Sequence, residues 1–205
     1  MLVSDFHERR LGESAEKLAA EFPEQQVATI VCDVSSTEQV DALITGAADQ
    51  LGRIDVLVNN AGLGGETPVV EMTDEEWDRV LDITLTSTFR ATRAALRYFR
   101  SVDHNGVLVN NASVLGWRAQ HSQAHYAAAK AGVMALTRCS AIEAPNTACA
   151  STPSPRPSPG TPSSRRSPAR NCSTTSPPGR PTAALPRSGR SQPPSRCSPA
   201  TTRPI

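Results

Sequence analysis

The sequence predicts an α/β protein with a doubly wound parallel sheet, and three observations carry this prediction. Short β-branched runs alternate with segments of helical spacing through the first 144 of the 205 residues. Polar residues follow four of these runs, at the strand ends where parallel sheets bind their ligands. Charge and proline are divided between two unlike parts of the chain. We therefore expect one ordered domain over 1–144 and a different kind of segment over 145–205.

Four runs have the composition of strands and alternate with four helical segments. The strand-like runs are residues 2–5, 27–31, 54–58 and 107–110. Apolar residues at helical spacing lie in 11–22, 40–51, 74–100 and 126–144. We expect Ser35 or Ser36 and Thr73 to act as N-caps, and Gly52 to end a helix. Strands and helices in this order imply parallel pairing with helical crossovers.

Residues 145–205 differ from the rest in charge and composition. They hold 15 of the 17 prolines and nine arginines but no Asp, Glu or Lys, so this segment is +9 and residues 1–144 are −8. Without apolar periodicity, burial cannot offset the entropy of ordering, and we expect a disordered low-complexity tail. Basic, proline-rich blocks can bind nucleic acid or a protein partner. Because the segment has no aromatic side chain to stack on bases, we expect no nucleic-acid binding.

Cysteine usage and hydropathy exclude several classes of protein. The five cysteines form no C-x-x-C pair and are odd in number, so we expect a reducing, cytoplasmic setting without disulfides or a metal site. No run approaches 18 apolar residues, and the N-terminus lacks a charged region followed by an apolar one. The sequence therefore predicts neither a membrane span nor a signal peptide.

The run from Asn111 to Lys130 carries the residues that point to catalysis. Tyr126 and Lys130 are four residues apart and share one helix face, and an ammonium beside a phenol favours the phenolate. Such a tyrosine can give a proton to an alkoxide or take one from an alcohol. Ser113 closes the preceding strand and can hydrogen-bond the same substrate oxygen. Taken alone, Tyr126 and Lys130 are more often an ordinary amphipathic helix start, and strand-end Asp, Asn and Ser are often turn residues.

Together these motifs resemble the short-chain dehydrogenase/reductase family over residues 1–144. Ser113, thirteen residues before the Tyr126-to-Lys130 run Y-A-A-A-K, matches the family's Ser…Tyr-x-x-x-Lys signature. The resemblance implies a Rossmann-like fold and hydride transfer between a nicotinamide cofactor and a secondary alcohol or ketone. It makes Tyr126 the catalytic acid/base, assigns Lys130 to the nicotinamide ribose and the phenolate, and has Ser113 orient the carbonyl.

The resemblance also assigns a set of cofactor contacts. N-N-A-G at 59–62 and C-D-V at 32–34 match family motifs at the ends of strands. The implied contacts lie beside the cofactor or at its adenine, and are Asp33, Val34, Asn60, Ala61 and Gly62. Asp5 ends the family's second strand and would bind the adenosine ribose hydroxyls. A carboxylate there repels a 2′-phosphate, so NAD is favoured over NADP. Arg9 and Arg10 lie nearby and are either a solvated helix start or a phosphate contact.

Three departures from the family pattern stand out. Thr84 occupies the position of the family's tetrad Asn. Met1 directly precedes the second family strand, so we expect the first strand and its Gly-rich phosphate loop, about 30 residues, to be absent. The final family strands should follow Ala144, where the Pro/Arg segment begins. Residues 145–156 can be translated back into degenerate codons. Read one base earlier, these codons permit E-H-G-V-R-V-N-A-V-T-P, a run of the kind the family carries after this helix. We therefore expect a frameshift near Ala144.

The substrate is indicated by the loop between Ser113 and Tyr126. Trp117 either stacks on an extended apolar substrate or packs against the sheet. The sequence of residues 111–123 resembles that of an actinobacterial branch of the family, whose enzymes oxidise hydroxyl groups on steroid-ring degradation intermediates. A 3-oxoacyl reductase of the same family and a non-catalytic remnant are the alternatives. Because the family's long helix, here 74–100, usually pairs subunits, we expect the intact relative to be a homo-oligomer acting on a small alcohol or ketone.

Overall fold

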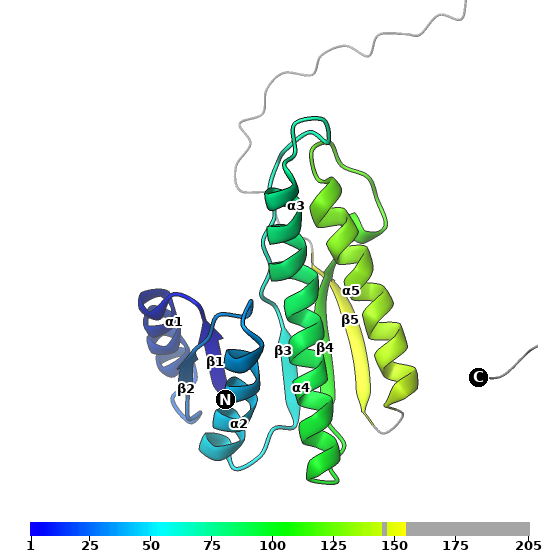
Figure 1. Ribbon diagram of the computed structural model, residues 1–205. Helices are drawn as coiled ribbons and strands as arrows, with labels where there is room; N and C mark the ends of the chain where they lie inside the picture. The colour runs from blue at the N-terminus through cyan, green and yellow to red at the C-terminus, as the bar shows by residue number, and fades with distance from the viewer. Residues whose placement is uncertain (145–146, 155–205) are drawn as a thin grey trace, which may run out of the picture. The chain divides into compact units, whose positions relative to one another are not determined.

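The computed structural model of the protein describes residues 1–144 and 147–154. Its five strands are parallel to their neighbours, which confirms the predicted fold class, but they form two sheets (Figure 1). One sheet pairs β1 (Leu2–Asp5) with β2 (Ala28–Val31). The other has the order β3-β4-β5 and consists of β3 (Val56–Asn59), β4 (Val107–Ser113) and β5 (Ala148–Ser154).

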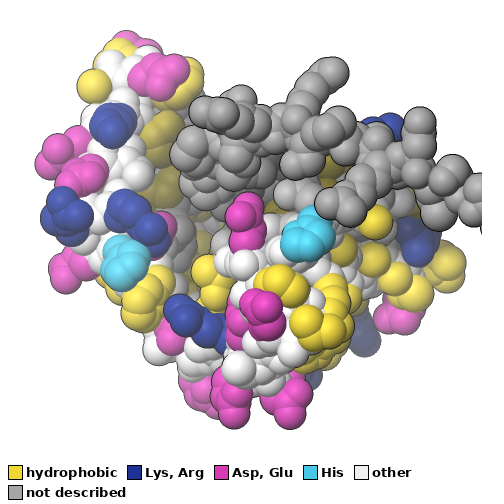
Figure 2. All heavy atoms as spheres, turned by 90° about the horizontal axis from the view of Figure 1, so that it is seen from above, with side chains coloured by type: hydrophobic (Ala, Val, Ile, Leu, Met, Phe, Trp, Pro, Cys, Tyr) yellow, Lys and Arg dark blue, Asp and Glu magenta, His cyan; other side chains and the backbone are white. Residues whose placement is uncertain are grey.

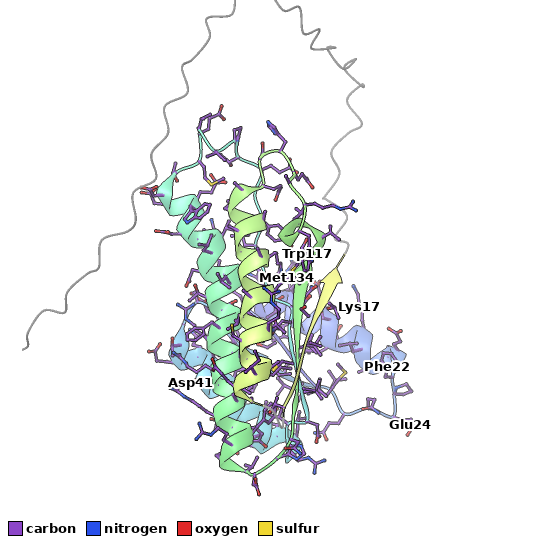
Figure 3. The ribbon with its side chains drawn as sticks, turned by 90° about the vertical axis from the view of Figure 1, so that its right-hand side faces the viewer. Lys17, Phe22, Glu24, Asp41, Trp117 and Met134 are labelled. Atoms are coloured by element: carbon purple, nitrogen blue, oxygen red, sulfur yellow. The ribbon has the colours of Figure 1, made fainter. Side chains whose placement is uncertain are left out.

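Helices connect the strands and cover the sheets. Helix α1 (Glu8–Glu21) contacts both β1 and β2, and α2 (Thr37–Leu51) leads from β2 towards β3. Helices α4 (Ser87–Ser101) and α5 (Ala124–Glu143) lie side by side over one face of the three-stranded sheet, as Figures 1 and 3 both show. No helix in the described part of the chain is long and apolar enough to cross a membrane.

The helix ends follow the chemistry predicted from the sequence. Ser36 caps α2 by accepting a 3.2 Å hydrogen bond from the Gln39 N–H, and Gly52 ends the helix with φ of 77°. Thr73 caps α3 (Asp74–Leu81) in the same way through the Glu76 N–H at 3.2 Å. Each cap satisfies a backbone donor that the first helical turn leaves unpaired.

The main core lies where α2, α4 and the strands meet. Its buried members are mostly small or branched apart from one aromatic ring, and they are Cys32, Val40, Ile44, Ala47, Ile54, Ala94, Ala95, Phe99 and Leu108. Gly106 shows how closely the start of β4 approaches α4, because a Cβ there would lie 2.1 Å from the Phe99 ring. Only glycine fits at such a contact.

The predicted helix over 74–100 is interrupted by a π-helical segment. Helix α3 is followed by η1 (Asp82–Thr86), and α4 continues from Ser87. The extra residue of a π-helical turn changes which side chains face inward, and such segments are frequent at functional sites. Here the turn brings Thr84 to complete burial.

The expectation of disorder from residue 145 onward is wrong for 148–154. Those residues form β5, in which Ala148 pairs with Val107 and Ser154 with Ser113. Composition predicts poor side-chain burial, but the outer edge of β4 supplies backbone partners that the composition cannot reveal. Cys149 also packs against the core. The expected disorder of residues 145–146 and 155–205 lies outside the described residues.

Candidate active site

Lys130 and Tyr126 lie one turn apart on α5, beside the carboxyl end of β4. Lys130 Nζ donates a 2.5 Å hydrogen bond to the carbonyl oxygen of Asn111 and lies 5.7 Å from the centroid of the Tyr126 ring. Lys130 is 4% exposed and Tyr126 is half-buried. A buried ammonium needs such an acceptor to offset its lost hydration. The predicted i, i+4 spacing thus brings the two side chains together at a strand end.

Ser113 is held at the same strand end. It is the last residue of β4, 4% exposed, and its Oγ accepts a 3.2 Å bond from the Leu115 N–H at the start of η2 (Val114–Gly116). Ser113 follows Asn111 by two residues, so both side chains leave the same face of the strand. The structure therefore gathers Ser113, Lys130 and Tyr126 around the end of β4.

Trp117 follows η2 and lies at the outer surface. Its side chain is 75% exposed, and Figure 3 shows it beyond Met134 of α5. Gly116 permits this close approach, since a Cβ there would lie 2.5 Å from the Met134 side chain. Exposure on this scale argues against packing on the sheet, which leaves the indole available to a ligand.

Thr84 anchors the segment that follows β3. Its Oγ1 donates to the Leu63 carbonyl at 2.8 Å and accepts from the Leu63 N–H at 2.9 Å. A Cβ on Gly62 would lie 3.7 Å from both Thr84 Oγ1 and Lys130 Nζ. Thr84 therefore uses its hydroxyl to hold backbone next to Lys130.

Paired asparagines tie the same segment to β4. Asn59 donates its side-chain amide to Asn110 Oδ1 at 2.9 Å, and Asn111 donates to Asn60 Oδ1 at 2.7 Å. Asn110 is fully buried and donates in turn to Thr137 of α5 at 2.8 Å. These bonds set the position of residues 59–62 relative to the Lys130 group.

A polar cluster that the sequence patterns did not indicate lies directly beside Tyr126. His125 is fully buried, its Nδ1 accepts from the Tyr126 N–H at 2.9 Å, and its Nε2 lies 3.5 Å from Glu76 Oε1. His125 Nε2 is buried and makes no hydrogen bond among the described residues, and it faces this carboxylate. Thr67 Oγ1 donates to the same Glu76 oxygen at 2.5 Å. In the sequence, the only indication of this cluster is the His next to the Tyr, and that pair does not reveal contacts to residues about 50 positions earlier.

Two glycines bring the loop after β3 against this cluster. A Cβ on Gly64 would lie 3.6 Å from the Tyr126 ring, and one on Gly65 would lie 2.8 Å from His125 Nε2. The Thr67 N–H also donates to the Ser122 carbonyl at 3.0 Å. The loop therefore covers one side of Tyr126, and a side chain at position 65 would push it away.

The residues assigned to the cofactor share one cavity. A cavity of about 670 Å³ is lined by residues from several strand ends, and these include Asp5, Asp33, Val34, Asn60, Ala61 and Gly62. Ser113, Trp117, Tyr126 and Lys130 are not among its lining residues. Gly62 links the two groups, since it lines the cavity and lies beside Lys130.

The two acidic side chains of this cavity hold their charge through local donors. Burial raises the pKa of Asp5, but hydrogen bonds from Arg10 Nη2 at 2.6 Å and the His7 N–H at 2.8 Å outweigh it and lower the pKa. The backbone N–H and hydroxyl of Ser35 donate to Asp33 at 2.9 and 2.7 Å and lower its pKa as well. Both are therefore carboxylates at neutral pH.

In the view of Figure 2, acidic, basic and hydrophobic side chains are intermixed on the surface.

A parallel α/β fold with polar residues gathered at strand ends and a Tyr-x-x-x-Lys helix beside a strand-end Ser is typical of the dehydrogenase/reductase class. The family model described as short chain dehydrogenase matches residues 1–150, and the chain belongs to this family.

Individual relatives agree with this assignment but are longer. A Mycobacterium tuberculosis (5R,7aS)-5-hydroxy-7a-methyl-1-oxo-2,3,5,6,7,7a-hexahydro-1H-indene-carboxyl-CoA reductase is 72% identical over 144 residues, which are 70% of this chain and 55% of the relative. A Mycobacterium smegmatis short chain dehydrogenase structure is 70% identical with a TM-score of 0.71, covering 73% of this chain and 63% of that one. An NAD+-bound xylitol dehydrogenase structure is 28% identical with a TM-score of 0.69, over 73% and 58% of the two chains. The chain spans about half the length of the curated relatives it matches.

Proposed function

We propose that residues 1–144 form part of an oxidoreductase that transfers a hydride between a nicotinamide cofactor and a secondary alcohol or ketone. The contact that carries the proposal is Lys130, buried on the Asn111 carbonyl and 5.7 Å from the Tyr126 ring. Tyr126 moves the proton of the substrate oxygen, and Ser113 orients that oxygen by a hydrogen bond. Family membership supports these roles.

The strand-end residues at the rim of the cavity have the side chains that a nicotinamide cofactor needs. Asp5, already engaged with Arg10, offers a carboxylate to the adenosine ribose, and Asn60 to Gly62 lead from there to Lys130. We propose NAD rather than NADP, because a carboxylate repels a 2′-phosphate. The cofactor would supply the ring that donates or accepts the hydride, and this chain's residues would hold the ribose and move the proton.

For the substrate we propose a fused-ring ketone or alcohol from steroid degradation. The 72% identical relative is a reductase of such a compound carried on coenzyme A. Trp117, 75% exposed and four residues after Ser113, offers an apolar face on which flat rings can stack. The 3-oxoacyl reductase alternative has weaker support, since the Vibrio cholerae reductase of that class is 38% identical over 111 residues.

The test uses residues 1–144 joined to the two flanking segments of the M. tuberculosis relative, here called the flank-restored chain. The substitution Tyr126→Phe removes the proton donor and keeps the ring, so we expect turnover to fall by roughly 10²–10⁴-fold while NADH affinity stays nearly unchanged. Turnover is followed by NADH absorbance and affinity by NADH fluorescence.

Tyr98→Phe is the matched control, because Tyr98 is the other tyrosine of the chain and its hydroxyl contacts the Ile54 N–H at 3.3 Å, away from the site. Turnover of the Tyr98 variant should stay near that of the parent. Near-parental turnover by the Tyr126 variant would remove Tyr126 from the mechanism.

A further inference from the structure

His125 is a buried side chain that the proposed proton transfer does not use. It directly precedes Tyr126 in the first turn of α5 and is completely buried. One of its ring nitrogens, Nδ1, accepts a 2.9 Å hydrogen bond from the Tyr126 N–H. The first turn of a helix leaves such donors without a partner inside the helix. This bond therefore fixes the backbone from which the Tyr126 side chain leaves.

The other ring nitrogen of His125 faces a carboxylate on a different helix. Nε2 is buried, makes no hydrogen bond among the described residues and lies 3.5 Å from Glu76 Oε1 in the first turn of α3. The starts of α3 and α5 lie side by side (Figure 1). Because a buried nitrogen without a partner is costly, the carboxylate is the group that matches this nitrogen.

Glu76 also holds the loop that follows β3. Thr67 Oγ1 donates a 2.5 Å hydrogen bond to Glu76 Oε1, the same oxygen that faces His125. The Thr67 N–H donates to the Ser122 carbonyl at 3.0 Å, shortly before α5 begins. One residue thus ties the loop both to α3 and to the segment that enters α5.

Two neighbouring glycines place this loop against both the tyrosine and the pair. A Cβ on Gly65 would lie 2.8 Å from His125 Nε2 and 3.1 Å from Glu76 Oε1. A Cβ on Gly64 would lie 3.6 Å from the Tyr126 ring. The loop backbone therefore touches the pair at one residue and the catalytic ring at the residue before it. Because the histidine is fully buried, a methyl group at position 65 would displace the loop instead.

We propose that His125 and Glu76 are positioning residues for Tyr126, an inference that rests on the proposed role of Tyr126 in proton transfer. His125 fixes the start of the helix through Nδ1. Glu76 holds the loop over the tyrosine ring through Thr67 and faces Nε2 of the histidine. The phenol then keeps one direction relative to the substrate oxygen, as proton transfer across a single hydrogen bond requires.

The test measures kcat and NADH affinity of the flank-restored chain, with a decalone, a fused bicyclic ketone, as the probe. His125→Ala removes both ring contacts. We expect kcat to fall by about 10–100-fold, the effect of misplacing a reacting group by about 1 Å. NADH affinity should change by less than about twofold, because the cofactor residues lie on other segments. The kcat is expressed per NADH-binding site, so that unfolded protein does not contribute.

Conservative variants separate the two contacts. His125→Asn keeps an acceptor oxygen near the place of Nδ1, so it should bond the Tyr126 N–H and recover part of the kcat lost in His125→Ala. Glu76→Gln keeps an oxygen for Thr67 and should stay closer to the parent than Glu76→Ala. Recovery of this kind is not expected if the two side chains only fill space.

Gly65→Ala displaces the loop while both side chains of the pair remain. We expect a lower kcat and faster hydrogen exchange at the Thr67 N–H, a readout that does not depend on the proposed function. His104→Asn is the matched control, because His104 contacts the Asp55 carboxylate at 3.0 Å ahead of β4 and β3, at their amino ends. Its kcat should stay near that of the parent. Unchanged exchange at Thr67 in Gly65→Ala would overturn the proposal.

A double variant separates positioning from general structural support. In the Tyr126→Phe background, His125→Ala should lower the residual kcat by no more than about twofold, because no phenol is left to position. Equal losses in both backgrounds, or near-parental kcat of the His125→Ala single variant, would overturn the proposal and leave the role of Tyr126 intact. Parental turnover by Tyr126→Phe alone would instead overturn the proposed function, and this proposal with it.

Discussion

The proposed choice of NAD over NADP depends on the side chain of Asp5. Its carboxylate forms a 2.6 Å ion pair with Arg10, and both line the cavity. Arg10 can therefore bind a phosphate when the Asp5 carboxylate is replaced. Because the pKa of Asp5 is below its usual value, the side chain stays charged throughout the neutral range. We expect the preference for NAD to be constant across neutral pH.

Asp5→Asn in the flank-restored chain should shift the preference towards NADP by about tenfold, since it removes the repulsion and releases Arg10. The measurement is the ratio of kcat/KM for the two cofactors. Asp41→Asn on α2 is the control, because Asp41 is outside the cavity lining. A parent protein that already prefers NADP would contradict the role given to Asp5.

At the scale of elements, η1 connects two parts of the site. It buries Thr84, whose hydroxyl makes both bonds to the backbone of Leu63. Thr84→Val keeps the shape but leaves the Leu63 N–H and C=O without a partner, which costs about 1–3 kcal/mol. We expect faster hydrogen exchange at Leu63 and a lower melting temperature in the flank-restored chain. Thr45→Val is the control, because its exposed hydroxyl bonds only the Asp41 carbonyl one turn earlier. Unchanged exchange at Leu63 would show that Thr84 does not hold this segment.

Elements that depend on local patterns could be predicted from the sequence, and those that depend on distant partners could not. The caps at Ser36 and Thr73 and the shared face of Tyr126 and Lys130 follow from spacing within a few residues. In contrast, β5 forms because β4 has an edge with which it can pair, and no local property of residues 148–154 indicates that edge. The His125–Glu76 contact joins residues 49 positions apart for the same reason. The division of the described strands into two sheets likewise became visible only in three dimensions.

At the scale of the molecule, β1 and β3 each have an edge without a partner strand among the described residues, and these edges decide the state of the 205-residue chain when it is alone. Exposed valines on both sheets and unpaired edges favour edge-to-edge association. Such exposure weighs heavily on a domain that is stable by only roughly 5–15 kcal/mol. The phosphate-binding backbone expected from the family is also absent from the described strands and loops.

We therefore expect the 205-residue chain alone to be largely insoluble or molten, without a cooperative thermal melt and without saturable NADH binding. The flank-restored chain should be monodisperse, melt cooperatively and bind NADH, because its added segments pair both edges and cover Val56 and Val58. The measurements are light scattering, a thermal melt and NADH fluorescence titration of both proteins side by side. A soluble 205-residue chain that melts in one transition and binds NADH saturably would show that the edges of β1 and β3 tolerate exposure, and the stability argument built on them would fail.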